Sequence, residues 1–139
     1  MTGTVANQLK ALGVTSKGIK QFDVYSVPDK AIDFPEERLN QTRKKHEKRL
    51  AIILQNNRDN NDPLIKIIAI APLSTSRESQ RLDYLLRKSN HPFLRDDSFI
   101  RVRHIQPVLK IELETKYGNI AQQNIRNDIY DRLFLLYDL

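Results

Sequence analysis

Two isoleucine-rich apolar runs lie close together in the sequence, and they constrain the fold more than any other feature. They read Leu-Ala-Ile-Ile-Leu-Gln over residues 50–55 and Leu-Ile-Lys-Ile-Ile-Ala-Ile-Ala over residues 64–71. Short, nearly continuous apolar runs bounded by turn residues are typical of strands buried on both faces. The intervening residues 56–63, Asn-Asn-Arg-Asp-Asn-Asn-Asp-Pro, form such a turn. We therefore expect two strands packed side by side.

The rest of the chain adds shorter strands and peripheral helices. Alternating residues predict a strand over 22–27 that Pro28 closes, and further strands are expected over 98–105 and 108–113. The Thr-Ser-Arg-Glu spacing at 75–78 resembles a capping box and predicts a helix to about residue 88. An amphipathic helix is predicted over 121–136. The pattern indicates an α+β fold, mainly β, with a mostly antiparallel sheet.

Domain organisation follows from length and composition. With 139 residues, the chain is expected to form one domain over 20–139, preceded by an extension over 1–19 with a short helix at 5–12 that Gly13 ends. Residues 29–48 are polar and are expected to form a long mobile connection with a helical turn. The chain has no cysteine, no long apolar run and no recognisable signal segment, which favours the cytoplasm.

The excess of positive charge is local. The net charge is +6, and residues 42–49, Thr-Arg-Lys-Lys-His-Glu-Lys-Arg, hold five cations against one anion. Such a patch is the electrostatic footprint of a polyanion-binding protein, although a solvated loop that aids solubility has the same composition. Nucleic acid is therefore a candidate partner, and Lys44, Lys45, His46 and Lys48 are candidate contacts.

The two apolar runs bring polar residues together. Arg49 begins the first run, and Ser74 and Thr75 follow Pro72 after the second. An arginine beside hydroxyl groups can hold a phosphate, because the guanidinium presents paired planar donors. Thr75 also suits a helix N-cap, which leaves Ser74 as the hydroxyl more available to a ligand.

A second pair of cations lies on the strand expected at 98–105. Arg101 and Arg103 are two residues apart, so on a strand they would share one face, where an anion or solvent would offset their repulsion. His104 would face the other way and is expected to be structural. The spacing of the three histidines demands no catalytic pair, and the sequence contains no metal-ligand pattern or glycine-rich phosphate loop. No cofactor is predicted.

Several segments in order resemble the MazF/PemK family of toxin endoribonucleases. These are Phe-Asp-Val-Tyr at 22–25, the run Arg-Leu-Ala-Ile-Ile-Leu-Gln-Asn-Asn at 49–57, and Ile-Ala-Pro-Leu-Ser-Thr at 70–75. Ile-Arg-Val-Arg-His-Ile-Gln at 100–106 is a looser match, and a glycine at 118 before a final helix is shared. The resemblance covers about residues 20–139. The chain departs from the family by Phe22 in place of a glycine, Leu50 in place of a proline, and Arg103 where some members have an aspartate.

The resemblance implies a small, strongly bent antiparallel sheet, an SH3-like and partly open barrel, with helices around it. It also implies metal-independent cleavage of single-stranded mRNA by a homodimer that an antitoxin protein neutralises. The site residues implied are Arg49 and Arg101 as cations at the phosphate and Ser74 as a hydrogen-bond donor to it. Thr75, Arg103 and the basic loop residues would bind RNA, and Phe22 or Tyr25 is a weaker candidate for stacking on a base.

Two points stay open at the level of sequence. An arginine is a poor general base, so the proton acceptor is unassigned, with His46 a candidate only because it lies three residues before Arg49. The alternatives to a nuclease are a gyrase-poison-like binder, which the lack of tryptophan disfavours, and an RNA-binding protein whose nuclease site has decayed, as the arginine at 103 would suggest.

Overall fold

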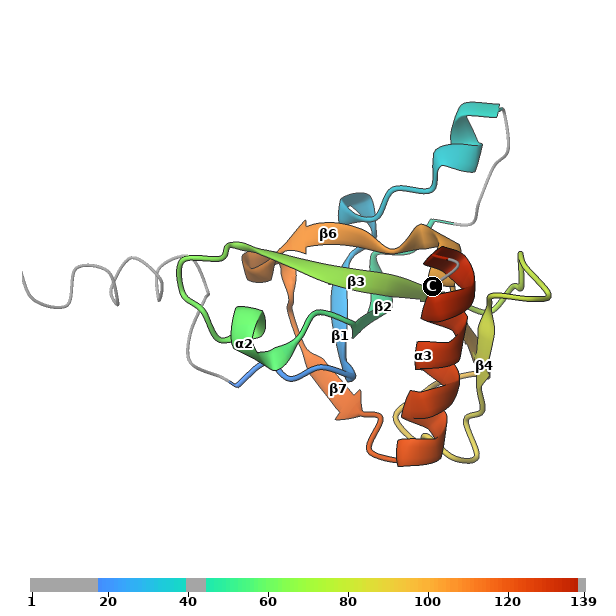
Figure 1. Ribbon diagram of the computed structural model, residues 1–139. Coiled ribbons are helices and arrows are strands. Elements are labelled where there is room, and N and C mark those ends of the chain that lie inside the picture. The colour runs from blue at the N-terminus through green and yellow to red at the C-terminus, as the bar shows by residue number, and fades with distance from the viewer. Residues whose placement is uncertain (1–17, 40–44, 138–139) are drawn as a thin grey trace, which may run out of the picture.

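The computed structural model describes residues 18–39 and 45–137, and within them a bent antiparallel sheet carries one long helix. Figure 1 shows α3 (Gln123–Tyr137) standing beside the sheet, with β4 next to it. The predicted helix at 5–12, the extension and residue Lys44 lie largely or wholly outside the described residues, so the predicted domain boundary stays a prediction. None of the helices described is long and apolar enough to cross a membrane.

The strands follow one another mostly as neighbours. The sheet order is β4-β5-β3-β2-β1-β7, and β6 pairs with β3. Every pairing is antiparallel. The strands are β1 (Asp23–Pro28), β2 (Lys48–Ile53), β3 (Ile67–Ser74), β4 (Tyr84–Leu86), β5 (Ser98–Ile100), β6 (Gln106–Leu109) and β7 (Lys116–Asn119). Short helices lie between them: η1 (Asp29–Ala31), η2 (Pro35–Leu39), α2 (Asn57–Asn60), η3 (Val102–His104) and η4 (Lys110–Glu112). The predicted α+β class and bent antiparallel sheet are confirmed.

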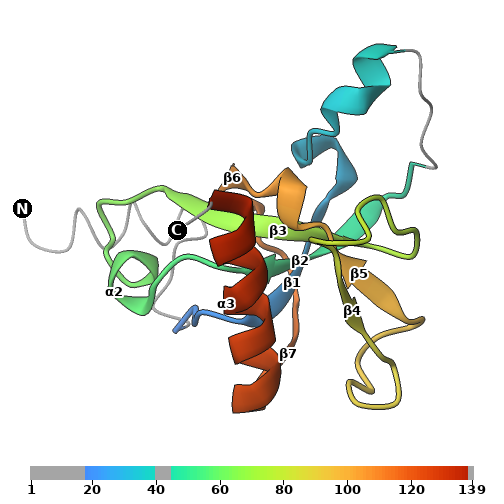
Figure 2. The same cartoon turned by 45° about the vertical axis from the view of Figure 1, so that its right-hand side comes forward.

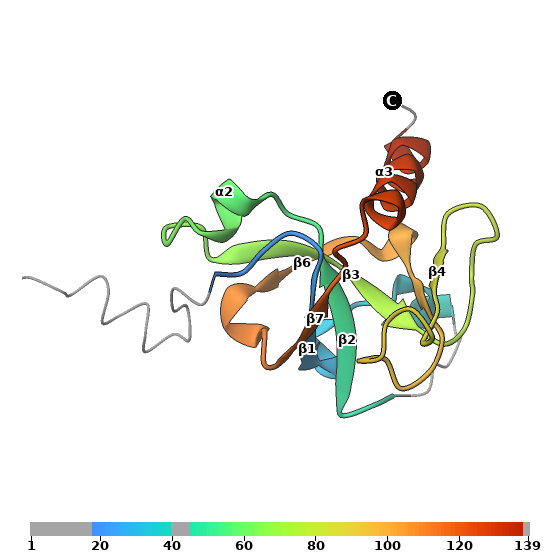
Figure 3. The ribbon, with the colours of Figure 1, turned by 90° about the horizontal axis from the view of Figure 1, so that it is seen from below.

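The two isoleucine-rich runs form the centre of the sheet, with a core on each face. Ile52 of β2 packs into a core that also contains residues of α3, whereas its neighbours Ala51 and Ile53 pack into a second core. Figure 3 shows β1 and β2 side by side from below, and both strands contribute residues to the second core. The predicted burial of both strands on both faces is therefore confirmed.

The helix predicted over 75–88 is wrong. Residues 75–83 form a loop, and β4 follows. The buried carboxylate of Asp83 accepts the backbone N–H groups of Glu78 (2.8 Å) and Ser79 (3.0 Å), which fixes the loop in a non-helical path. Leu82 and Leu86 are buried as expected, but from a loop and a strand rather than from a helix. Thr75 caps no helix and is exposed.

Two other predicted boundaries move. The strand expected over 98–105 ends at Ile100 and is followed by η3, and the strand expected over 108–113 starts at residue 106 and gives way to η4. The buried ammonium of Lys110 donates to the carbonyls of Asp59 (3.0 Å) and Asp62 (2.9 Å), so it draws η4 toward the α2 turn. In the connection between β1 and β2, η1 and η2 confirm the predicted helical turn.

Phe22 occupies a backbone position that suits glycine. Its φ is 71°, in the left-handed region that side chains disfavour. The ring is buried against Tyr130 at 5.4 Å between centroids and lies 4.9 Å from the Arg126 guanidinium carbon. The packing offsets the backbone strain. Phe22 and Tyr25 are 1% and 6% exposed, so the idea that either stacks on a nucleotide base is wrong.

Gly118 allows β7 to pass under the ring of Phe93. An added Cβ at this position would lie 2.5 Å and 2.7 Å from two ring carbons of Phe93. Gly118→Ala should therefore lower the free energy of unfolding by about 1–3 kcal/mol, the usual range for overpacking, in urea denaturation. Adding Phe93→Leu should recover part of the loss. Equal stability of Gly118→Ala and the wild type would contradict this close packing.

Candidate active site

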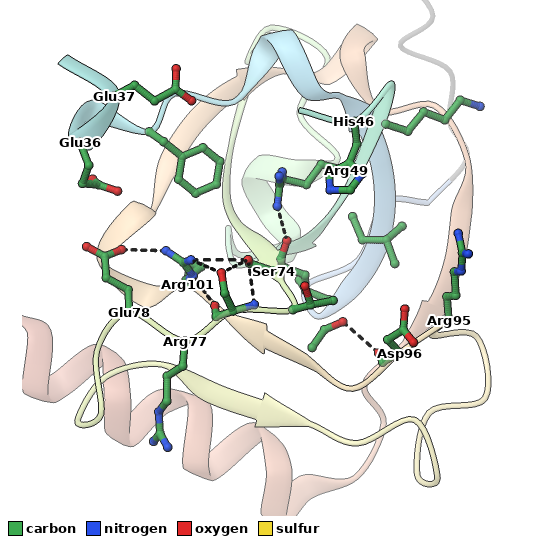
Figure 4. A pocket seen from close by; sticks show the side chains of 17 residues that line it. Glu36, Glu37, His46, Arg49, Ser74, Arg77, Glu78, Arg95, Asp96 and Arg101 are labelled. Atoms are coloured by element: carbon green, nitrogen blue, oxygen red, sulfur yellow. Dashed lines mark hydrogen bonds and ion pairs between the residues drawn. The ribbon is translucent and has the colours of Figure 1, made fainter. Parts of the chain in front are cut away.

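A polar pocket of about 770 Å³ opens where β2 and β5 begin and β3 ends, near the connection after β1. Its lining comes from five stretches of the chain: residues 34–37, 46–50, 73–78, 95–98 and 101. Figure 4 shows Arg49 and Arg101 approaching from two sides, with Ser74 between them. The antiparallel pairing of β2 with β3, and of β3 with β5, places all three residues at one end of the sheet.

Arg101 is the most extensively bonded cation in the pocket among the described residues. It is buried, and its Nε donates to the Ser76 carbonyl at 2.9 Å. Nη1 donates to Glu78 at 2.7 Å, and Nη2 donates to the hydroxyls of Ser76 at 3.0 Å and Ser74 at 3.5 Å. These contacts fix the plane of the guanidinium and leave its charge at the pocket wall.

Arg101 and Arg103 do not share a face, contrary to the expectation from a continuous strand. Because β5 ends at Ile100 and η3 begins at Val102, the chain turns between the two arginines. Arg101 enters the pocket, whereas Arg103 is exposed and does not line it. The arginine that stands where some members of the resembled family have aspartate therefore does not obstruct the pocket.

Arg49 is held in place by the protein, unlike a solvent-exposed cation at the end of a strand. Its side chain is 9% exposed and pairs with the buried carboxylate of Asp29 at 3.0 Å. Nη1 donates to the Leu73 carbonyl at 3.0 Å. Its third nitrogen, Nη2, has no hydrogen-bond partner among the described residues, which leaves this donor for a ligand.

Phe34 lies close to both arginines. The Arg49 guanidinium carbon lies 5.0 Å from the centre of the Phe34 ring, and that of Arg101 lies 5.9 Å from it. Both distances are within the range of cation–π attraction. Phe34 is buried and comes from the segment before η2. One ring therefore contacts two cations that come from different parts of the chain, β2 and the turn after β5.

Three consecutive residues with hydroxyl groups, Ser74 to Ser76, lie at the end of β3. The Ser74 Oγ accepts the backbone N–H of Ser76 at 3.2 Å and lies 3.2 Å from the Ser76 Oγ. Ser74 is partly buried, and Thr75 and Ser76 are exposed on the pocket wall. Pro72 lies inside β3: it pairs with Ala51, and its carbonyl accepts the N–H of Arg101 at 2.9 Å.

The basic loop contributes part of what was expected. His46 and Lys48 line the pocket. Lys45 is exposed and does not line it, and Lys44 lies outside the described residues. The structure also brings in Arg77 and Arg95, which sequence reasoning missed. Arg77 points away from Ser74 in Figure 4 and caps the carbonyls of Ser79 and Gln80.

Sequence reasoning also missed an acidic cluster beside Arg101. The Nε2 atom of buried His104 lies 2.9 Å and 2.8 Å from the two oxygens of Glu36 and 3.5 Å from Glu78. One donor atom from each of these residues lies within 4.8 Å of the others, a spacing that could hold a metal ion. Arg101 already supplies positive charge there through its bond to Glu78. No sequence signal links Glu36 to His104, because 68 residues separate them.

The environment of Glu36 keeps it ionised. Burial alone would raise its pKa, but the hydrogen bond from His104, the charge of His104 and that of Arg101 outweigh it and lower the pKa below its ordinary value. The pocket thus holds an ionised carboxylate beside two arginines and a row of hydroxyls. This combination can bind a phosphate, stabilise negative charge and accept a proton.

Comparison with known proteins gives a consistent result. A family model described as PemK-like, MazF-like toxin of type II toxin–antitoxin system matches residues 30–133. Among solved structures, the Mycobacterium tuberculosis toxin MazF-mt6 is similar, with a TM-score of 0.57 and 15% sequence identity over 67% of this chain and 89% of that chain. At this identity the structural match concerns the fold alone. A search of curated proteins found no match.

Proposed function

Since the chain belongs to the PemK-like, MazF-like family of type II toxin–antitoxin toxins, we propose that it is an endoribonuclease that cleaves single-stranded mRNA without a metal ion. The observation that carries this proposal is the convergence of Arg49 and Arg101 on the Ser74 end of β3. Two nearly buried guanidiniums beside a hydroxyl match the needs of a phosphodiester whose negative charge grows during the reaction.

Each of the three residues has a distinct proposed role. The Nη2 of Arg49 donates to a non-bridging phosphate oxygen, and Arg101 supplies a second cation as the charge develops. The hydroxyl of Ser74 donates a hydrogen bond to the same phosphate. The attacking group is the 2′-hydroxyl of the RNA, which explains why the reaction would need neither a metal ion nor a cysteine.

The RNA strand would run over the basic side of the pocket. Thr75, His46 and Lys48 line the pocket and would contact the phosphates next to the cleaved one. Lys44 and Lys45 would extend this contact along the loop. Arg103 lies outside the pocket, so it would touch RNA only beyond it. Because phosphate contacts dominate, binding should weaken as salt rises.

The partners proposed follow from family membership. They are an antitoxin protein that covers the RNA groove and a second copy of the chain in a homodimer, in the cytoplasm. A second candidate function is RNA binding without cleavage. The argument for it was that Arg103 stands where some family members have an aspartate, so that a carboxylate would be missing from the site. The exposed position of Arg103 outside the pocket weakens that argument.

Cleavage in EDTA tests the proposal. The pure protein should cut a mixed-sequence single-stranded RNA in the presence of EDTA and leave DNA of the same sequence intact, because DNA has no 2′-hydroxyl. Arg49→Ala should cut at least about 10²-fold more slowly, the usual loss for one charge-stabilising donor. Gel analysis of end-labelled RNA measures both rates, and thermal unfolding reports whether the variant is folded.

Two outcomes would contradict the proposal. If neither protein cuts but the wild type binds the RNA, the chain is a binder and not a nuclease. If both proteins cut equally fast, the nuclease reading survives but Arg49 is not part of its site.

A further inference from the structure

Resting on the proposed nuclease function, we propose that Glu36 is the general base that takes the proton of the 2′-hydroxyl and that buried His104 positions its carboxylate. Glu36 lines the pocket, and its side chain is 32% exposed, so it can reach a substrate. His104 does not line the pocket, and its side chain is 4% exposed. His104 therefore acts through Glu36 and does not touch the RNA.

The hydrogen-bond pattern shows that the imidazole of His104, and not the carboxylate of Glu36, carries the proton in the hydrogen bond between them. The Nε2 of His104 faces oxygens of Glu36 and Glu78. Ionised carboxylates only accept hydrogen bonds, so Nε2 must be the donor. The Nδ1 atom is buried and has no partner within the described residues, so the ring cannot relay a proton onward through a partner there. The carboxylate itself is left as the proton acceptor.

Glu78 is a weaker candidate for this role than Glu36. Its Oε2 lies 2.7 Å from the Nη1 of Arg101, so protonating it would weaken the ion pair that orients the cation. Glu36 is held by the neutral or charged imidazole instead and has oxygen lone pairs left for a substrate. Figure 4 shows Glu36 and Glu78 on one side of Arg101 and Ser74 on the other.

The placement suits an in-line displacement at a phosphate held by Arg101 and Ser74. Glu36 takes the proton from the 2′-hydroxyl, and the 2′-oxygen forms a bond to phosphorus. The bond from phosphorus to the 5′-oxygen breaks, and that oxygen takes a proton from water. Glu36 returns its proton to the solvent, so no net proton is gained or lost on the protein. The products are a 2′,3′-cyclic phosphate and a 5′-hydroxyl end.

Single-turnover cleavage measured against pH tests this assignment. Glu36→Gln should slow cleavage by about 10²–10⁴-fold, the usual contribution of general-base catalysis, and should lose the fall in rate at low pH. Glu114→Gln, an exposed glutamate that does not line the pocket, should behave as the wild type. Affinity for an RNA with 2′-deoxy substitution at the cleaved position should change less than about twofold for Glu36→Gln, since the pocket keeps its cations.

The role of His104 has its own readout. A base works only when deprotonated, so the rate falls as pH drops through the pKa of Glu36. Because His104 lowers that pKa, His104→Asn should move the fall in rate to higher pH at unchanged affinity for the 2′-deoxy RNA. If this variant does not fold, Glu36→Asp, which draws the carboxylate away from His104, should show the same upward shift. Glu78, His46 and His104 are other ionisable groups in or beside the pocket, so the comparison with Glu36→Gln identifies the group responsible.

The outcomes separate the two proposals. A wild-type protein that cuts, together with a Glu36→Gln variant that cuts equally fast with the same pH profile, overturns the assignment of Glu36 alone. An unshifted profile in His104→Asn overturns the positioning role. A wild-type protein that cuts no RNA overturns the proposed function and this inference with it.

Discussion

Replacing Arg101 with lysine should reduce the rate of RNA cleavage by about 10²–10³-fold while RNA affinity changes far less. Lysine keeps the positive charge but is a point donor, whereas the guanidinium of Arg101 reaches Ser76, Glu78 and Ser74 from one plane. The lysine ammonium carries all its donors on one nitrogen, so it cannot reproduce the contacts that Nε, Nη1 and Nη2 of Arg101 make in separate directions. Single-turnover rates and binding of a 2′-deoxy RNA measure the two effects.

The chain offers a matched control two residues away. Arg103→Lys makes the same chemical change at an exposed position outside the pocket, so the cleavage rate should stay within about twofold, as for surface changes remote from a site. Equal rates for Arg101→Lys and the wild type would remove Arg101 from the reaction. Equal losses in both variants would show that the effect is not specific to the arginine in the pocket.

Replacing Asp29 with alanine should lower the free energy of unfolding by about 3–5 kcal/mol, the usual cost of breaking a buried ion pair. The Asp29 and Arg49 side chains are 4% and 9% exposed, so alanine leaves the arginine charge buried without its partner. The Asp29 carboxylate also accepts the backbone N–H of His46 at 2.7 Å. The substitution therefore also removes a hydrogen bond that holds the segment leading into β2. Urea denaturation measures the loss.

An exposed pair in the same connection serves as the control. Asp33 pairs with Arg38 at 3.1 Å, but these side chains are 61% and 73% exposed. Asp33→Ala should therefore change stability by less than about 1 kcal/mol. Adding Arg49→Leu to Asp29→Ala should recover part of the loss, because it removes the unpaired charge. A similar small effect at both aspartates would show that the Asp29 pair is not buried in solution.

The sequence predicted the parts of the fold that depend on local pattern. The isoleucine runs, the alternation before Pro28 and the final amphipathic helix correspond to β2, β3, β1 and α3. The neighbouring placement of Arg49 and Ser74 was also predictable, because two antiparallel strands joined by a turn return to the same end of the sheet.

The predictions from sequence failed where contacts between residues distant in the sequence determine the local structure. The capping-box pattern at Thr75 favoured a helix, but the carboxylate of Asp83 takes the N–H groups that such a helix would need. The alternation of residues predicted that Arg101 and Arg103 share one face of a strand. In the structure, β5 ends before Arg101 and η3 begins after it. Local patterns contain no information on such contacts, so they could not reveal the pairing of Glu36 with His104 either.

The position of Phe34 has a consequence for how this chain can change in evolution. One ring lies against both pocket arginines, and Figure 2 shows the connection between β1 and β2 that carries it. A substitution at Phe34 therefore alters the setting in which any change at Arg49 or Arg101 is tolerated. We therefore expect substitutions at these three positions to have effects that depend on one another, as is usual for residues in contact.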